Sequence, residues 1–385
     1  MRANRKEHKR LKVHRALFFC SVLILAACRQ SYEPPAIKAP NKYLVVEGVM
    51  NANAGERTTI KLSMTRNLLD TFITDPVTSA QVQIEARSGT GYQLQEQAGG
   101  TYISDPLTLN AGETYRLKIR ANGDEYLSDY VPVKITPAID SLNWRQNDDV
   151  TIYVSTHDPT NNARYYRWDF TETWQYRAEY ETILGVQNGL IFYRDANTQV
   201  YNCWRYADAT QIALGTSVKL SEDVINQAPV TQIPKGSPRL GVRYSILVRQ
   251  YALTEDAHKY WEILKKNTQS LGTLFDAQPG QLRSNLYKTS DPDEPVIGFA
   301  SASSVTEKRM FISNGELTNW TSLDPKPDCQ LQFTPQDPNN YLIYKYPDTA
   351  YAPYYFVTGG GIALARKACL ECTWHGGTNQ KPSFW

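Results

Sequence analysis

Apolar and polar residues alternate along most of the stretch from residue 43 to residue 133. Ile60 and Leu62, or Val82 and Ile84, are separated by single polar residues, the period of a strand with one buried face. Gly- and Asn-containing turn segments separate these runs. The pattern predicts seven strands: Tyr43–Met50, Thr58–Ser63, Ala80–Ala86, Tyr92–Glu96, Thr101–Ser104, Thr114–Ala121 and Tyr126–Val133.

Seven short strands in some ninety residues are typical of an immunoglobulin-like β-sandwich, predicted here for residues 41–136. This region contains no cysteine, so its packed core must stabilise it. Thr136–Leu142 is expected to be a linker. A larger β-rich domain is then expected over residues 140–385, because a chain of 385 residues is long for a single core.

Strands are predicted in the second region as well: Thr151–Ser155, Arg164–Thr173, Val296–Ser303, Lys308–Ser313, Tyr341–Tyr346 and Tyr354–Thr358. Aromatic residues are dense here, and they either form a binding face or fill the core of a broad sheet. The strict alternation of Tyr166, Trp168 and Phe170 favours the core. The candidates for a binding face are Tyr165, Trp174, Tyr176, Tyr180, Tyr193 and Trp204.

One amphipathic helix is predicted over residues 255–271. Thr254 suits the N-cap position, and Glu255 and Asp256 suit the first turn. Its apolar stripe, expected to pack on the second sheet, comprises Ala257, Tyr260, Trp261, Leu264, Thr268 and Leu271. Gly272 is a suitable residue to end the helix.

The N-terminus has the features of an export signal. A basic segment precedes the nine-residue apolar run Leu17–Leu25, which is too short to span a bilayer as a helix, since that takes about 20 residues. Leu25-Ala26-Ala27-Cys28 resembles a bacterial lipobox, which implies cleavage of residues 1–27 and lipidation of Cys28. An ordinary secretory signal is the alternative. Residues 28–40 contain three prolines and are expected to form a tether.

The expected location is the outer membrane, with the protein held by its lipid anchor. Arg29 and Gln30 follow Cys28, and the Asp that argues for inner-membrane retention is absent. Which face of the outer membrane the protein occupies is left open. Seven of the 41 Lys/Arg and one of the 39 Asp/Glu lie in residues 1–27, which leaves 34 and 38, a net charge near −4. Such a chain has no basic tract for nucleic acid, so that class of partner is excluded.

Four cysteines remain once Cys20 in the signal and Cys28 are set aside: Cys203, Cys329, Cys369 and Cys372. In an exported protein they are expected to form disulfides. Either Cys203 and Cys329 each pair with one tail cysteine, or Cys369 pairs with Cys372 and Cys203 with Cys329. The alternative is a zinc site, because Cys369, Cys372 and His375 have C-x-x-C-x-x-H spacing. The oxidising compartment favours the disulfides.

No catalytic constellation is visible. The chain after residue 28 has three histidines, His157, His258 and His375, and none lies in a metalloprotease motif. A nucleophile elbow, a P-loop and a dinucleotide fingerprint are also absent from the sequence. We therefore expect a protein that is not an enzyme and uses no cofactor. The tail Cys369–Trp385 is expected to dock onto the second domain.

Three segments carry a family resemblance: Lys259–Asn285, the stretch Asp-Glu-Pro-Val-Ile-Gly-Phe-Ala-Ser-Ala-Ser-Ser that begins at Asp293, and the tail. Together they resemble the Bacteroidota lipoprotein family called domain of unknown function 4249. The resemblance implies an accessory, ligand-binding lipoprotein of an uptake system built around a TonB-dependent outer-membrane receptor. It supplies no catalytic or ligand residues, and the ligand is not identified. The alternatives are a surface hydrolase of glycans or peptides and an adhesin or envelope-structural protein.

Overall fold

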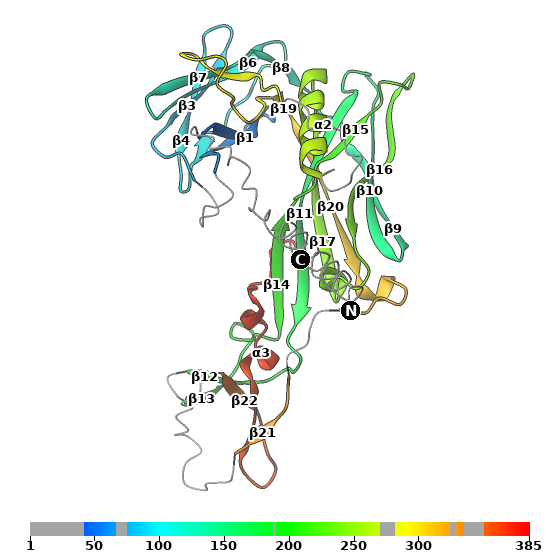
Figure 1. Ribbon diagram of the computed structural model, residues 1–385. Helices are drawn as coiled ribbons and strands as arrows, with labels where there is room; N and C mark the ends of the chain where they lie inside the picture. Colours follow the sequence, from blue (N-terminus) through cyan, green and yellow to red (C-terminus); the bar gives the residue numbers. More distant parts are fainter. Residues whose placement is uncertain (1–41, 67–74, 188–189, 270–281, 324–327, 335–349) are drawn as a thin grey trace, which may run out of the picture. The chain divides into compact units, whose positions relative to one another are not determined.

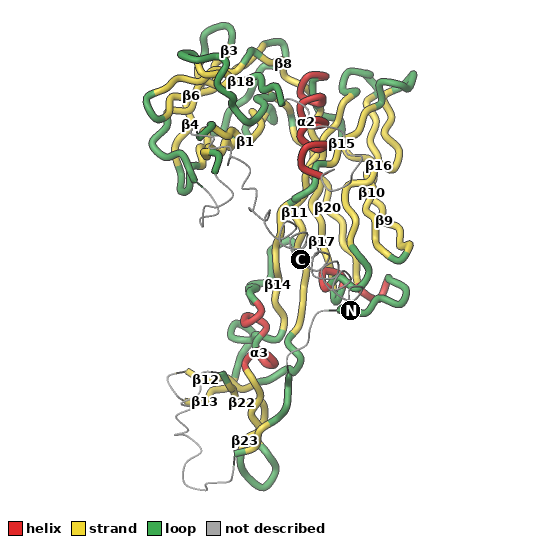
Figure 2. Tube along the Cα trace, viewed as in Figure 1, coloured by secondary structure: helices red, strands yellow, loops and turns green. Residues whose placement is uncertain are grey.

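The computed structural model describes residues 42–66, 75–187, 190–269, 282–323, 328–334 and 350–385 (Figure 1). Cys28, the signal, the tether, Leu271, Gly272 and the predicted strand Tyr341–Tyr346 lie outside these residues. Almost all the described chain falls within a single structural unit, Tyr43–Thr65 with Phe72–Trp385. The fold is mainly β, as predicted, and yellow strands dominate Figure 2. No helix in the described ranges is long and apolar enough to cross a membrane.

The first sheet contains the strands predicted from alternation. Its order is β18-β7-β6-β3-β4-β5-β2-β1-β19-β8, and β6 also pairs with β8, which closes eight strands into a barrel-like sheet. Buried side chains such as Ile60, Leu62, Ile84 and Leu117 form its core. The strands are β1 (Leu44–Asn51), β2 (Thr59–Met64), β3 (Gln81–Ala86), β4 (Gly91–Glu96), β5 (Thr101–Ser104), β6 (Thr114–Ala121), β7 (Asp124–Ser128), β8 (Val131–Lys134), β18 (Leu286–Lys288) and β19 (Ala302–Ser303).

A late segment of the chain completes this first sheet. β18 pairs with β7, and β19 lies parallel to both β1 and β8. Leu286, Val296, Ala300 and Ala302 are buried in the same core as β1–β8. Strands β18 and β19 therefore belong to the first sheet, although the sequence placed them in a second domain over residues 140–385. Only Ala302–Ser303 of the predicted strand Val296–Ser303 is a strand.

Two local predictions were wrong. The predicted strand Tyr126–Val133 is two strands, β7 and β8, separated at Asp129-Tyr130. The predicted linker Thr136–Leu142 is in large part the beginning of β9 (Ile139–Asn147). Most side chains of β9 are exposed or half-buried, so the strand lacks the apolar alternation that reveals a one-sided strand in sequence.

The second region is a pair of sheets around a separate core. One sheet has the order β16-β10-β9, the other β14-β11-β17-β20 with β15 also paired to β11. Tyr166, Trp168 and Phe170 are buried between them, which confirms the core interpretation of that alternation. The strands are β10 (Asp149–Asp158), β11 (Tyr165–Arg177), β14 (Asn202–Asp208), β15 (Ala213–Thr216), β16 (Asp223–Ile233), β17 (Arg243–Ala252) and β20 (Val305–Ser313).

The predicted helix is α2 (Glu255–Gln269), and Thr254 caps it, since its Oγ1 accepts a hydrogen bond from the backbone N–H of Ala257 at 3.2 Å. Ala257 and Tyr260 are buried as predicted, whereas Thr268 is exposed. A smaller third region contains a hairpin, β12 (Leu184–Gln187) and β13 (Leu190–Tyr193), and a sheet of β21 (Gln332–Phe333), β23 (Ile362–Arg366) and β22 (Tyr351–Phe356). The short helices α3 (Lys367–Leu370) and η3 (Cys372–His375) follow β23.

Candidate ligand-binding pocket

The six aromatic residues proposed for a binding face do not share a surface. Trp204 is buried at 6% exposure, and Tyr165 lies against His258 with ring centroids 5.1 Å apart. Trp174 lies beside Arg239, while Tyr176 and Tyr180 donate hydrogen bonds to the carbonyl oxygens of Cys372 and Cys329. Only Tyr193 is well exposed, at 67%. Most of these rings therefore stabilise the chain locally.

The four cysteines form two disulfides, Cys203–Cys372 and Cys329–Cys369. This is the first of the two predicted arrangements, in which both tail cysteines pair with the second region. The zinc alternative is wrong for this structure because both sulfurs of the C-x-x-C are bonded to other sulfurs. His375 contacts the carbonyl oxygen of Ala368 through Nε2 at 2.7 Å. The described residues contain no group of His, Cys, Asp and Glu that would hold a metal ion.

The tail docks onto β14 and the neighbouring sheet, as expected. Trp204 and Thr378 exchange two backbone hydrogen bonds, of 2.8 and 3.0 Å. A side chain at Gly377 would collide with the hydroxyl of Tyr176, so the close approach of the tail requires a glycine there. Trp385 contacts Phe311 and Trp204 edge to face, with ring centroids 5.7 and 6.2 Å apart. The tail is therefore a structural element rather than a ligand site.

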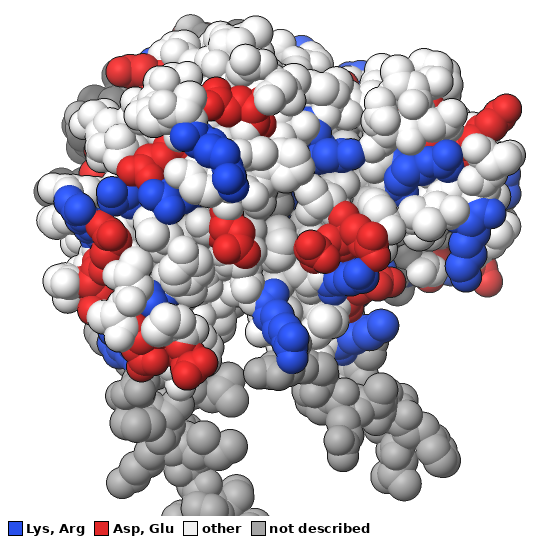
Figure 3. Space-filling view, turned by 90° about the horizontal axis from the view of Figure 1, so that it is seen from above, with Lys and Arg blue, Asp and Glu red and all other residues white. Residues whose placement is uncertain are grey.

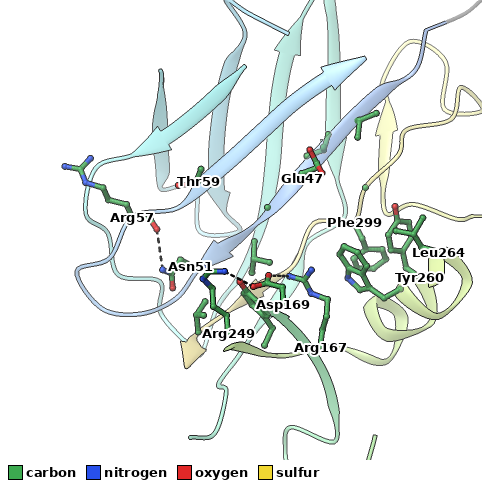
Figure 4. A pocket seen from close by; sticks show the side chains of 18 of the residues that line it. Glu47, Asn51, Arg57, Thr59, Arg167, Asp169, Arg249, Tyr260, Leu264 and Phe299 are labelled. Carbon is green, nitrogen blue, oxygen red and sulfur yellow. Dashed lines mark hydrogen bonds and ion pairs between the residues drawn. The ribbon is translucent and has the colours of Figure 1, made fainter. Parts of the chain in front are cut away.

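The pocket of interest lies where β1 and β2 face β11, β17 and β20, with α2 at one side (Figure 4). Its volume is about 770 Å³. Segments far apart in the sequence contribute to it, including residues 45–59, 167–169, 249–251, 260–264 and 297–307. Asn53 fixes the two walls to each other: its side chain donates to the carbonyl oxygen of Val305 at 2.9 Å and accepts from the Val305 N–H at 2.8 Å.

Arg167 is the most constrained side chain of the pocket. Its guanidinium lies between two rings, 4.5 Å from the centroid of Tyr251 and 4.4 Å from that of Trp261. Strand β11 points Arg167 away from the core, because its neighbours Tyr166 and Trp168 point inward. Cation–π contacts on both faces hold the planar group and leave only its edge for hydrogen bonds.

A chain of ion pairs crosses the sheet beside Arg167. Asp169 contacts Arg167 Nη2 at 3.4 Å and Arg249 Nη1 at 3.1 Å, and Arg249 Nε reaches Glu307 at 3.2 Å. Burial alone would lower the pKa of Arg249, but Asp169 and Glu307 outweigh it and raise that pKa. Burial, assisted by the negative charge of Asp169, raises the pKa of Tyr251. Arg249 is therefore charged and Tyr251 is neutral at physiological pH.

The opposite wall of the pocket is β1. Glu47 is exposed there, and no ion pair to it is found within the described ranges. Gly48 has a φ of +134°, and a side chain at this position would collide with the carbonyl oxygen of Thr59. Only glycine tolerates both the conformation and the close approach. The backbone of β1 thus lines this part of the pocket without a covering side chain.

Aromatic residues close the side next to α2. The rings of Tyr260 and Phe299 are 5.4 Å apart, and Tyr260 also meets Trp261 edge to face at 5.7 Å. Burial raises the pKa of Tyr260 to about 12, so its hydroxyl stays neutral. The pocket therefore combines apolar rings, three guanidiniums and carboxylates on both walls.

Sequence reasoning missed Arg167, Asp169 and Arg249. A partial signal was present, because Arg167 and Asp169 are the polar positions between the buried Tyr166, Trp168 and Phe170. Charged residues of opposite sign two apart on a strand lie on one face. Their partners on β17, however, depend on the register that pairs Arg167 with Tyr251 and Asp169 with Arg249.

Charge elsewhere does not gather into a single-sign surface. In the view of Figure 3, Lys and Arg are interspersed with Asp and Glu. Many of these are in ion pairs, such as Glu85 with Arg116 at 2.7 Å and with Lys118 at 3.2 Å.

The family model described as "Domain of unknown function (DUF4249)" matches residues 29–309. The chain belongs to this family. Every residue that lines the pocket falls within the matched range, and the disulfide-linked tail falls outside it. No curated protein matches the chain.

Two solved structures show a distant similarity. A DUF4785 family protein from Legionella pneumophila subsp. pneumophila str. Philadelphia 1 has 10% sequence identity and a TM-score of 0.17, with 53% of this chain and 51% of that protein covered. The adhesin InvE of Yersinia pseudotuberculosis has 15% identity and a TM-score of 0.16, with 55% of each chain covered. The match thus spans about half the length of each neighbour, and at such TM-scores neither informs the function.

Proposed function

We propose that this protein is an outer-membrane lipoprotein that binds a ligand as an accessory component of a TonB-dependent uptake system. The observation that carries the binding role is the pocket, which is preformed by interlocked segments and lined by fixed charges and rings. Its volume lies within the range of about 300–1,000 Å³ typical of sites for small ligands. The lipobox at Cys28 and the resemblance described above support the membrane anchor and the uptake system.

The contacts of the carboxylate of Asp169 favour a binding function over hydrolysis. Asp169, between β11 and β17, is engaged by the guanidiniums of both Arg167 and Arg249. A carboxylate held in this way is occupied by two cations of the protein itself, whereas a general acid must be free to pass a proton to the substrate. We therefore assign Asp169 the role of orienting the two arginines.

Lipidation is tested by labelling cells with radioactive palmitate. We expect label on the wild-type protein and on Cys20→Ala, a matched change within the signal, and none on Cys28→Ala. An unlabelled wild type would contradict the lipid anchor.

The uptake role is tested by purifying the tagged lipoprotein from membranes solubilised in mild detergent. We expect a TonB-dependent receptor to co-purify with the wild type and to be lost with Cys28→Ala, which would leave the protein unanchored. Recovery of the lipoprotein without any receptor, at several detergent concentrations, would contradict the proposed role.

A further inference from the structure

We propose that the pocket binds a zwitterionic ligand of short-peptide size, with its carboxylate on Arg167 and its ammonium group near Glu47. This inference rests on the proposed binding function and specifies its ligand class. Figure 4 shows Arg167 on the side of β11 and Glu47 on the side of β1.

The hydrogen-bonding state of Arg167 indicates an acceptor that the protein itself does not supply. A guanidinium has five N–H donors, yet its one hydrogen bond within the described chain goes to Asp169, at the long distance of 3.4 Å. Its Nε is buried without a partner among the described residues. Buried polar groups are nearly always satisfied, so an arginine with spare donors in a pocket is a recognition group.

The shape of that group selects a carboxylate. The rings of Tyr251 and Trp261 pack against the guanidinium, whose N–H donors point outward from its edge. Two parallel N–H donors at the edge match the two oxygens of a carboxylate. Because the side chain is already held in place and is only 14% exposed, little conformational entropy is lost on binding.

The charge balance of the lining argues against a simple anion. Three arginines line the pocket, Arg57, Arg167 and Arg249, against four carboxylates, Glu47, Glu56, Asp169 and Glu307. A phosphate with two negative charges would be repelled by this excess of carboxylates. A ligand that carries one carboxylate together with one ammonium group adds no net charge and can satisfy Arg167 and Glu47 together.

The remaining surface suits the body of a peptide. Tyr260 and Phe299 offer an apolar wall beside Glu47, and the exposed backbone of β1 at Gly48 leaves room for a main chain to approach. A volume of about 770 Å³ accommodates a few residues and excludes a folded partner.

The test is equilibrium dialysis of the detergent-solubilised full lipoprotein against an equimolar mixture of tripeptides with free termini, read by mass spectrometry. Parallel samples contain the same tripeptides amidated at the C-terminus, the same tripeptides acetylated at the N-terminus, maltotriose and inorganic phosphate. We expect free tripeptides to be retained, amidation to weaken binding at least tenfold and acetylation to weaken it about threefold to tenfold.

Variants locate the two contacts. Arg167→Met should reduce tripeptide binding at least tenfold, and Arg120→Met should leave it unchanged, because Arg120 also pairs with a carboxylate, Glu125, but does not line the pocket. Glu47→Gln should weaken free tripeptides and leave the acetylated ones unaffected. Arg167→Lys keeps the charge and loses the paired donors, so it provides the same test if Arg167→Met does not fold.

Several results would overturn the inference. Equal binding of amidated and free tripeptides, or full binding by a folded Arg167 variant, would exclude the carboxylate contact. Retention of maltotriose or phosphate in place of tripeptides would reject the ligand class while leaving a binding protein. Retention of none of the probes would reject the ligand class as well, and the receptor co-purification would then decide the uptake role separately.

Discussion

The first sheet and the third region are stabilised in different ways. The first sheet encloses a core of 24 buried hydrophobic residues among those described, and it contains no cysteine. In the third region and the tail, the described clusters hold four and three buried residues. Cys369 is one of the four, with the partly buried Cys329 packed against them, and Cys203 and Cys372 are two of the three. Small cores bury too little apolar surface to offset the entropy of an ordered chain, and disulfides commonly compensate.

The comparison explains where the covalent links lie. Cys203–Cys372 joins residues 169 apart in sequence and fixes η3 to β14, and Cys329–Cys369 fixes α3 to the segment before β21. Beside them, the ion pair of Arg194 and Glu371, at 2.7 Å, has side chains only 8% and 18% exposed. The disulfides thus stabilise the tail, whereas apolar packing stabilises the first sheet.

The largest expected effect is on the tail disulfide. Replacing both Cys203 and Cys372 by Ser should destabilise the docked tail by about 5 kcal/mol, because the link closes a loop of 169 residues. The Cys329→Ser/Cys369→Ser pair should lose about 1 kcal/mol less, since its loop has 40 residues. Amide hydrogen exchange measures both, and we expect protection in β1–β8 to persist. Equal loss of protection in both regions would contradict the comparison.

The second prediction concerns the apolar core of the first sheet. Leu117→Ala removes a side chain that is 1% exposed in the centre of β6 and should cost about 3–4 kcal/mol as a cavity. The first sheet should lose protection from hydrogen exchange, and the tail should keep it. Leu323→Ala, at a residue 76% exposed, is the control. If Leu117→Ala also removed the exchange protection of the tail, the two regions would not be stabilised independently of each other.

The third prediction concerns the segment that joins the first sheet late in the chain. Gly298 has a φ of +137°, and a side chain there would meet the carbonyl oxygen of Val46. Gly298→Ala should therefore cost about 2 kcal/mol, mainly by loosening residues 286–303 from β1. Thermal unfolding measures the loss. Gly315→Ala, which faces open space at an ordinary φ, should be nearly neutral; a similar loss in both variants would exclude the proposed collision.

The smallest effect is a pH dependence in α2. Burial lowers the pKa of His258 below its ordinary 6.5, partly opposed by Glu262. As the pH falls, His258 is protonated in the unfolded chain at a higher pH than in the folded protein. The contribution of neutral His258 to the free energy of unfolding is therefore complete above about pH 6.5 and is lost below it. His258→Gln should flatten the fall in Tm between pH 7 and 5.

A second histidine provides the control for that pH dependence. His157 is exposed, and its pKa is raised by hydrogen bonding to Asp140, so its contribution has the opposite sign. The stabilisation that His157 contributes is present at low pH and is lost as the pH rises through the pKa of His157 in the folded protein. His157→Gln should therefore leave the fall in Tm at low pH or steepen it. A wild-type pH profile in His258→Gln would contradict the assignment.

Alternation predicted strands well where one face is buried and one is solvated. β5 and β6 have the predicted bounds, and β1–β4 differ by at most one residue at either end. It failed for β9, whose side chains are largely exposed, and for β17, which was not predicted at all. Seven of the ten residues of β17 are buried, because this central strand meets the core on one face and the pocket on the other.

The pocket was out of reach for a related reason. Its lining comes from five separate segments between residues 45 and 307. The strands that face each other across the pocket, β1 and β2 on one side and β11, β17 and β20 on the other, are far apart in the sequence. The binding-face candidates were chosen for aromatic density, whereas the rings that line the pocket include Tyr251, Tyr260 and Phe299. What distinguishes these rings is their position around Arg167 and α2.

The sequence by itself determined a mainly β protein, its helix with the Thr254 cap, the burial of Tyr166, Trp168 and Phe170, and the use of cysteines as disulfides. These follow from local periodicity and residue chemistry. Only the tertiary structure decided which cysteines pair, that residues 286–303 complete the first sheet, and that Arg167 is clamped between Tyr251 and Trp261. Those features depend on strand register and on contacts between distant segments. Local periodicity specifies neither, because many folds share the same local pattern.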